Sequence, residues 1–537
     1  MKIIDGHDLQ PQATITADIC IVGAGAAGIT IASALDGSPH SVCLIESGGY
    51  GPDEATQSLY DVINVGYPMR EHFMSRARYF GGTCNLWAGR SMRLTQLDLE
   101  RRDWVPDSGW PITYDELQRY YVKAEHILRL PSFDRVAREI LPRRMSPAER
   151  AIFANDDLQP NISTWAKKPL RFGAAYEAQL RRSKNIAVYL HLSITDIRLN
   201  RAGTAVEELA ACTLSGTQVK IRARRFVLAC GGMENARLLL ASRDVQPHGI
   251  GNQFDLVGRY FMDHPRVVFG KVKLHVPQKL PLMLGVPLAG GMAQVGIQFS
   301  EQAQRRQRLL DHYLTLERHW SPQTAKAYQS FIHTMKIVLR RGYSGKRFAF
   351  SSANLAKVPE LIYLLAPREL MPHFLYRLSR FMRNTLGRGM RELIVVNYCE
   401  QAPNAQSRVY LSHERDRLHL PRLIVDWRVT AEETRCLVRL QELLDQHLKK
   451  HQLGYLDTAS SDFSDLTYTD ASHHIGTTRM SDDPRKGVVD RHGRVHGVQN
   501  LFIAGSSVFP TCGHANPTLT IVALAVRLAE HLKNTPG

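Results

Sequence analysis

The sequence predicts an α/β protein of two domains, one built on a parallel sheet and the other on an antiparallel sheet covered by helices. Three observations predict this fold class. An apolar strand, a glycine-rich turn, a helix and a second apolar strand open the chain within residues 17–46. Residues 266–276 and 292–300 alternate apolar and polar side chains with period two, which is typical of antiparallel strands. An apolar strand, a loop and an amphipathic helix close the chain within 471–537.

The opening segment, ADICIVGAGAAGITIASALDGSPHSVCLIE, has the element order of a dinucleotide-binding unit. Gly23 would permit the tight turn, Gly25 would let backbone approach a pyrophosphate, and Gly28 would allow the helix to pack closely on the strand. Glu46 lies 18 residues beyond Gly28, where an acid would hold ribose hydroxyls. The turn suits NAD and FAD equally, because both present ADP to it, and similar turns also occur without a ligand.

Composition excludes several classes of protein. The 537 residues are 44% apolar and 22% charged, which is typical of a soluble globular protein. Eight scattered cysteines without a CxxC pair predict neither a disulfide framework nor a zinc site, and we expect no metal. The net charge of +17 favours anionic partners, but no nucleic-acid-binding motif accompanies it, so we expect no nucleic acid. The first residues lack a secretory pattern, which leads us to expect a cytoplasmic protein.

Two further segments suggest a flat ligand. Residues 79–90, YFGGTCNLWAGR, place two glycines in a loop beside Asn and Trp, where backbone can pass close to such a ligand. The last helix is expected to begin at Asn516-Pro517-Thr518, with Asn516 as its cap and Pro517 at its first position. If that helix end points at the ligand, its partial positive charge would stabilise a negative charge there.

Seven ordered segments resemble the glucose–methanol–choline (GMC) family of flavin oxidoreductases, and the resemblance covers most of the chain. They are GAGAAG with Glu46, GGTCNLWAGR, DSGWPITYDELQRYY at 107–121, CGGMENARLLLAS at 230–242, VGRYFMDHP at 257–265, EQAPNAQSRVYLS at 400–412 and the C-terminal block. The resemblance implies a two-domain GMC fold, in which a Rossmann-like domain binds FAD. We expect this FAD domain to comprise 1–130, 185–265 and 465–537. The substrate domain would comprise 131–184 and 266–464, with a basic helical insertion at about 301–390.

The resemblance also implies the site residues. The family pattern H-P-x-G-T-x-R-M carries the catalytic histidine at its first position, which is His473 here, and His474 replaces the usual proline and remains an alternative base. The Asn of the family's N-P-x-x-T pattern falls on Asn516. Leu86 stands where some members link FAD covalently through histidine, so we expect non-covalent FAD. The residues expected to bind FAD are Gly23, Gly25, Ala26, Ala27, Gly28, Glu46, Ser47, Gly81, Gly82, Thr83, Asn85, Leu86, Trp87, Ala88, Ile194, Gly505, Ser506, Asn516, Pro517 and Thr518.

The chemistry of an alcohol restricts the mechanism. An aliphatic alcohol has a pKa of about 16 and an ordinary histidine about 6.5, so full proton transfer before hydride loss would cost roughly 12 kcal/mol. The proton must therefore leave as the hydride departs to flavin N5, or the alkoxide must be held by donors. We expect His473 to accept the hydroxyl proton and Asn516 to donate a hydrogen bond to the same oxygen. His264 and His514 are interpreted as structural or supporting residues.

The expected function is oxidation of a carbinol, most simply in a sugar, glycoside or polyol, with oxygen or another acceptor taking the electrons. The same fold leaves open a flavin-bound lyase or decarboxylase, or a non-catalytic protein at a lipid surface. Residues 301–390 hold sixteen Lys or Arg against five Asp or Glu, which is typical of a solvated basic face. Alternatively, 361–384 would dock on an anionic membrane or a lipid-linked substrate, although it is too interrupted to span a bilayer.

Overall fold

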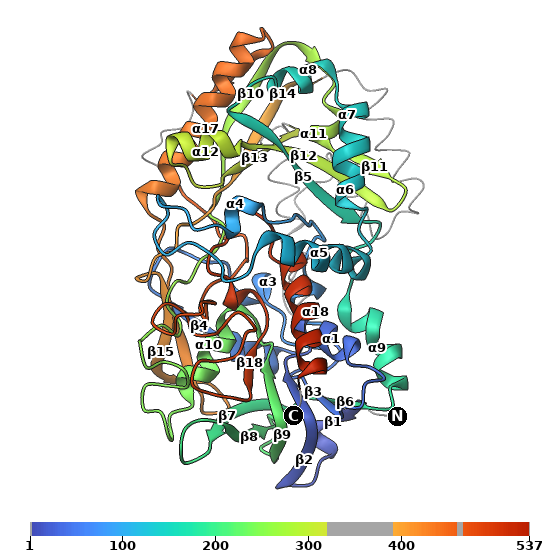
Figure 1. Ribbon diagram of the computed structural model, residues 1–537, viewed down its shortest axis with the longest axis vertical. Helices are drawn as coiled ribbons and strands as arrows, with labels where there is room; N and C mark the ends of the chain where they lie inside the picture. Colours follow the sequence, from blue (N-terminus) through green and yellow to red (C-terminus); the bar gives the residue numbers. More distant parts are fainter. Residues whose placement is uncertain (1–2, 319–389, 459–465, 536–537) are drawn as a thin grey trace, which may run out of the picture.

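The computed structural model describes residues 3–318, 390–458 and 466–535, and it has two stacked halves (Figure 1). A largely parallel sheet with its helices forms the lower half in this view, and an antiparallel sheet covered by α17 (Ala431–Lys450) forms the upper half. Helix α18 (Thr518–Asn534) starts near the middle of the molecule and runs down beside α1 (Ala26–Ala34). The predicted two-domain α/β architecture is confirmed.

The lower sheet has eight strands in the order β1, β6, β3, β2, β9, β8 and β7, with β18 beside β9. All neighbours pair in parallel except β8, which runs antiparallel to both β9 and β7. Strand β3 has no exposed residue, because parallel sheets are covered on both faces. The strands are β1 (Ile3–Asp5), β2 (Ala13–Val22), β3 (Val42–Ile45), β6 (Ile186–Leu190), β7 (Ser193–Leu199), β8 (Val206–Cys212), β9 (Gln218–Leu228) and β18 (Leu501–Ile503).

The upper sheet has seven strands in the order β11, β12, β13, β14, β10 and β17, with β5 also pairing with β12. One face carries apolar side chains such as Ile297 and Leu314, which pack with Leu440 and Leu444 of α17. Helix α17 begins with a capping box between Thr430 and Glu433. The strands are β5 (Leu158–Ala166), β10 (Arg266–Gln278), β11 (Val286–Leu288), β12 (Gly291–Phe299), β13 (Tyr313–Arg318), β14 (Met390–Tyr398) and β17 (Gly454–Asp457).

A third, small sheet and several helices complete the described residues. The small sheet joins β15 (Arg408–Arg415), β16 (Pro421–Asp426) and β4 (Val62–Asn64), and β15 lies against α10 of the lower half. The longer helices include α5 (Tyr114–Leu128), α9 (Phe172–Arg182) and α10 (Gly231–Ala241). The short ones are α2 (Glu54–Gln57), α3 (His72–Ser75), α4 (Gln96–Leu99), α6 (Phe133–Arg135), α7 (Leu141–Arg144), α8 (Pro147–Ile152), α11 (Pro281–Leu284) and α12 (Glu301–Gln307).

The structure moves three of the predicted domain boundaries. Helix α9 packs against α1, so the end of segment 131–184 belongs with the domain that was predicted to bind FAD. Strands β15 and β16 pair with β4 and not with the upper sheet, because period-two alternation does not say which sheet a strand joins. Residues 313–318 form a strand inside the upper sheet, so the predicted insertion does not begin at 301. The rest of that insertion up to 389, including 361–384, lies outside the described residues.

Two expectations about composition can be compared with the described ranges. Each of the eight cysteines is free, and most are buried. Within residues 3–318, 390–458 and 466–535, no helix combines the length and the apolar character needed to cross a membrane.

Shortening a side chain in the apolar layer between α17 and the upper sheet should destabilise the substrate domain. Leu444 is fully buried there, so Leu444→Ala should lower the free energy of unfolding by about 2–5 kcal/mol. Thermal and urea unfolding would measure the loss. Val122→Ala, at an exposed helical position, is the control and should change stability little. Equal stability of the two variants would contradict the proposed packing.

Candidate active site

The turn between β2 and α1 is built as the sequence predicts. Gly23 has a φ of +102°, and a Cβ atom there would lie 2.6 Å from the Ala229 carbonyl oxygen. A Cβ atom on Gly28 would lie 1.9 Å from the carbonyl oxygen of Gly23, so only glycine allows the helix this close to the turn. Both glycines are therefore dictated by backbone packing, with or without a ligand.

A second glycine pair closes over this turn. The Gly81 N–H donates to the Ala24 carbonyl oxygen at 2.8 Å. A Cβ atom on Gly82 would lie 2.7 Å from the Gly25 Cα atom, whereas a Cβ atom on Gly25 would have no neighbour closer than 3.9 Å. The turn at Gly23–Gly28 and the loop at Gly81–Gly82 thus lie against each other. Each was predicted separately to bring backbone without side chains close to a ligand.

The predicted acid at the end of β3 is in place. Glu46 is buried, and its carboxylate accepts the N–H groups of Ala24 and Gly48, both at 3.0 Å. Burial raises the pKa of Glu46, while these two backbone hydrogen bonds oppose the rise. Each carboxylate oxygen keeps a second lone pair, so ribose hydroxyls could still donate to it. Ser47 contacts Ser193 at 2.5 Å, which brings Ile194 of β7 to the same corner.

The other predicted cofactor residues fall in three places. Ala26 and Ala27 form the first turn of α1. The loop with Thr83, Asn85, Leu86, Trp87 and Ala88 is held by Arg171, whose Nη1 donates to the carbonyl oxygens of Cys84 and Trp87 at 2.9 Å. Residues on both sides of the C-terminal loop complete the set, namely Gly505, Ser506, Asn516, Pro517 and Thr518.

The two helices that begin at the predicted cofactor segments, α1 and α18, leave their N-terminal N–H groups without a side-chain cap. Neither α1 nor α18 has a side-chain capping bond or an acidic residue in its first turn, so both ends keep their partial positive charge. The expectation that Asn516 caps α18 is wrong. Pro517 occupies the cap position, because the Asn516 side chain turns instead toward His473. Uncapped helix ends, bare glycine backbone and a buried acid together fit FAD, whose pyrophosphate is anionic.

His473 stands at the centre of a short chain of hydrogen bonds. Its Nδ1 lies 2.8 Å from Nδ1 of His264, and its Nε2 lies 3.1 Å from Nδ2 of Asn516. Nε2 of His264 faces the Cys512 carbonyl oxygen at 3.4 Å. The structure therefore brings the two predicted catalytic residues together, and it adds His264 as the neighbour of His473.

Backbone pairing explains why two histidines 209 residues apart meet. Met262 and Ile475 exchange both backbone hydrogen bonds, at 3.0 and 2.9 Å. Beside this bridge, the buried Asp263 carboxylate accepts the backbone N–H groups of His264 at 2.7 Å and His473 at 2.9 Å. Asp263 was not predicted as a site residue, because one acid in a sequence does not reveal which backbone groups it binds.

The contacts determine the tautomers of both imidazoles. A carbonyl oxygen only accepts, so Nε2 of His264 carries a proton and the Nδ1 of neutral His264 is bare. His473 must then donate from Nδ1, which leaves its Nε2 lone pair facing the amide N–H of Asn516. His473 thus presents an unprotonated nitrogen beside Asn516, as a proton acceptor must.

Burial keeps these imidazoles neutral. Loss of hydration, followed by repulsion from His264, His474 and Arg70, lowers the pKa of His473 well below its ordinary value. Burial likewise lowers the pKa of His264 to about 3, with His514 adding to the shift. Neither ring therefore carries a proton on both nitrogens at neutral pH.

His474 points elsewhere. Its ring stacks on Phe261 with the centroids 5.9 Å apart, and its Nε2 lies 4.0 Å from the Asp263 carboxylate. Burial lowers its pKa to about 3, and Arg76 adds to the shift. Its carbonyl oxygen accepts the Ser506 hydroxyl at 2.6 Å. The geometry thus brings His473 and not His474 to Asn516.

Comparison with known proteins agrees with this geometry. A family model described as GMC oxidoreductase matches residues 403–525, and one described as FAD dependent oxidoreductase matches residues 18–250. The chain is 24% identical to paromamine 6'-oxidase of Streptomyces fradiae, over 98% of this chain and 93% of that protein. It is also 24% identical to the fructose dehydrogenase large subunit of Gluconobacter japonicus, over 97% and 98%.

In both its front part and its C-terminal part, the chain is therefore similar to the GMC oxidoreductases. It is an FAD-dependent enzyme that oxidises a carbinol, as the resemblance implied. The fold is shared with the crystal structure of pyridoxine 4-oxidase from Mesorbium loti, with a TM-score of 0.56 and 16% identity over 97% of this chain and 100% of the other.

Filling the contact between the two glycine segments should weaken FAD binding. Gly82 has a φ of +58°, and its Cβ would press on Gly25, so Gly82→Ala should lower FAD affinity about tenfold or more. Titration of apoprotein with FAD, followed by flavin fluorescence, measures this change. Gly51→Ala is the matched control, because a Cβ there has open space. Unchanged affinity in Gly82→Ala would contradict the placement of FAD at this contact.

Proposed function

We propose that this FAD-dependent enzyme oxidises a hydroxyl of a sugar, glycoside or polyol, with His473 as the proton acceptor and Asn516 as a hydrogen-bond donor to the reacting oxygen. The observation that carries the proposal is the lone pair of His473 Nε2 facing the Asn516 amide at 3.1 Å. Relatives named for paromamine and fructose support the carbohydrate class.

Bound FAD supplies the two-electron acceptor for the hydride. The protein supplies orientation and proton transfer. A hydroxyl placed between His473 and Asn516 would donate to Nε2 and accept from Nδ2, and these two contacts restrict the direction of its C–H bond. The chain's uncapped helix ends would hold the anionic parts of the cofactor.

The low pKa of His473 makes a free alkoxide implausible as an intermediate. A base weaker than ordinary histidine widens the pKa gap to an alcohol, so complete proton transfer ahead of hydride loss would cost more than roughly 12 kcal/mol. The proton should therefore move to Nε2 while the C–H bond breaks. Asn516 lowers the barrier by donating to the oxygen as negative charge develops on it.

FAD is proposed to bind without a covalent link. Leu86, at the position of the linking histidine in some members, has no atom that can form such a bond. Cys84, two residues away, is buried, and burial raises its pKa to about 12, so its thiol stays protonated and unreactive.

An anaerobic absorbance titration tests the function. Purified holoenzyme is mixed with sugars, glycosides, polyols and simple alcohols, and we expect one class to bleach the oxidised flavin. His473→Ala should reduce the bleaching rate by roughly 10²–10⁴-fold, as loss of a general base does. His248→Ala, at an exposed histidine, is the control and should behave as wild type. Bound flavin that no alcohol bleaches would contradict the function, and undiminished bleaching in His473→Ala would contradict the assigned base.

The rate of flavin reduction should not fall when the pH is lowered from neutral to mildly acidic values. Only neutral His473 accepts a proton, and its folded pKa lies below 6.5, so activity is lost as pH falls through that lower value. The rate should thus be flat between about pH 7 and pH 6. Stopped-flow reduction at each pH measures it, with FAD content as the control for loss of cofactor. A rate that halves near pH 6.5 would show that His473 titrates normally or is not the base.

A further inference from the structure

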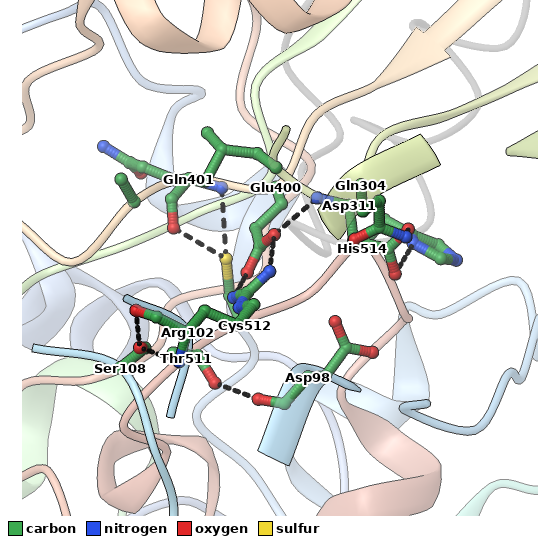
Figure 2. Close-up of polar contacts among 12 residues, drawn as sticks. Asp98, Arg102, Ser108, Gln304, Asp311, Glu400, Gln401, Thr511, Cys512 and His514 are labelled. Atoms are coloured by element: carbon green, nitrogen blue, oxygen red, sulfur yellow. Dashed lines mark hydrogen bonds and ion pairs between the residues drawn. The ribbon is translucent and has the colours of Figure 1, made fainter. Parts of the chain in front are cut away.

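A buried network of charged side chains lies beneath the loop that carries Asn516. Asp98 and Arg102 come from α4 and the residues after it, Asp311 precedes β13, Glu400 follows β14, and His514 belongs to the loop itself. All five side chains are almost completely buried. Figure 2 shows them drawn together around the 511–514 segment, although they come from four separate stretches of the chain. Charges so deep in a protein are costly unless they are paired.

Two ion pairs organise this network. Arg102 forms a two-pronged contact with Glu400, whose Oε2 also accepts the Asp311 backbone N–H at 2.6 Å. Asp311 in turn lies 2.8 Å from Nδ1 of His514, and Gln304 donates to its other oxygen at 3.1 Å. Burial opposes a charge on His514, but the Asp311 carboxylate outweighs it and raises the pKa of His514, which favours the charged form of the ring.

Asp98 is the member with too few partners. Its Oδ2 accepts from Thr95, but no N–H or O–H group among the described residues donates to its Oδ1. It lies within hydrogen-bonding range of Asp311. Burial, with repulsion from Asp311 and Glu400, raises the pKa of Asp98 to about 8. With Asp98 protonated and His514 charged, the five side chains would hold two positive and two negative charges, and the buried network would be neutral.

The loop above Asp98 contacts both His473 and its neighbour His264. A Cβ atom on Gly513, at a φ of +52°, would lie 3.0 Å from the Asp98 carboxyl group, so loop and acid touch. On one side of Gly513, the Cys512 carbonyl oxygen fixes His264 and through it the tautomer of His473. On the other side, Asn516 contacts His473 directly. A shift of this loop would therefore disturb the base from two directions.

We propose that Asp98 is a positioning residue which, as a neutral acid donating to Asp311, holds the loop of residues 511–516 against His473 and His264, and that its ionisation disengages the loop and stops the reaction. The inference rests on the proposed oxidation. It assigns the alkaline limit of activity to Asp98 and not to any group that touches the substrate.

The surroundings of Asp98 explain the direction of the effect. The groups that face it are Asp311, Glu400, Arg102, His514, Cys512 and Tyr121 of α5. Loss of its proton adds an unpaired negative charge next to two carboxylates and removes the hydrogen bond to Asp311. The Gly513 backbone, in contact with the new charge, and His514 must then rearrange. A displacement of about 1 Å at a catalytic group can cost about 10²-fold in rate.

The pH profile of Asp98→Asn tests the proposal, because an amide keeps a donor toward Asp311 but does not ionise. In wild type, the rate of anaerobic flavin reduction should fall on the alkaline side with a midpoint near the pKa of about 8. Asp98→Asn should match wild type at pH 7 and show no alkaline fall. Asp103→Asn, at an exposed carboxylate, should keep the wild-type profile. A retained alkaline fall in Asp98→Asn would overturn the proposal.

A second variant and an infrared measurement on the wild-type protein test the proposal even if Asp98→Asn does not fold. Asp311→Asn removes the negative charge that pairs with His514 and leaves one acceptor oxygen where Asp311 has two. It should slow reduction about 10²-fold at every pH with FAD content unchanged; a wild-type rate would count against the proposal. Infrared difference spectra of wild type should show a buried carboxylic acid band that disappears near pH 8, and its absence would refute the neutral acid. If no alcohol reduces the flavin at any pH, the proposed oxidation fails, while the infrared titration still tests Asp98.

Discussion

One hydrogen bond between two imidazoles underlies the chemistry of this site. His264 presents a bare Nδ1 because its other nitrogen faces a carbonyl oxygen, and this forces His473 to donate from Nδ1 and to expose the Nε2 lone pair. A carboxylate at the same position would strengthen the base by stabilising its cation, as in hydrolase triads. Neutral His264 determines the tautomer of His473 but does not stabilise the His473 cation. The result is a weak base, suited to receiving a proton only while the hydride departs.

The rest of the fold keeps that hydrogen bond in place. Backbone pairing between Met262 and Ile475, reinforced by Asp263, aligns the two histidines from one side. The loop 511–516 aligns them from the other, and buried charged side chains from separate stretches of the chain lie around this loop (Figure 2). FAD-binding segments and substrate-domain segments therefore cannot shift independently of the catalytic pair.

Features created by interactions between neighbouring residues could be predicted from the sequence, whereas features created by contacts between distant residues could not. The turn was predicted because local sterics demand glycine at Gly23 and Gly28, and the strands at 266–276 and 292–300 were predicted from side-chain alternation. The contact between His264 and His473 was not predicted, because backbone pairing across 209 residues leaves no local pattern. Buried acids such as Asp98 look like surface acids in a sequence. Period-two alternation similarly could not reveal that β15 and β16 join β4.

The coupling of proton and hydride movement can be measured directly. Stopped-flow reduction of the enzyme-bound flavin is followed with an alcohol deuterated at the reacting carbon, in H₂O and in D₂O. Deuterium at the reacting carbon and D₂O as the solvent should each slow the reduction. The isotope effect of the carbon-bound deuterium should be as large in D₂O as in H₂O, because proton and hydride transfer share one barrier. If the isotope effect of the carbon-bound deuterium vanishes in D₂O, or is absent in both solvents, then His473 does not take the proton as the C–H bond breaks.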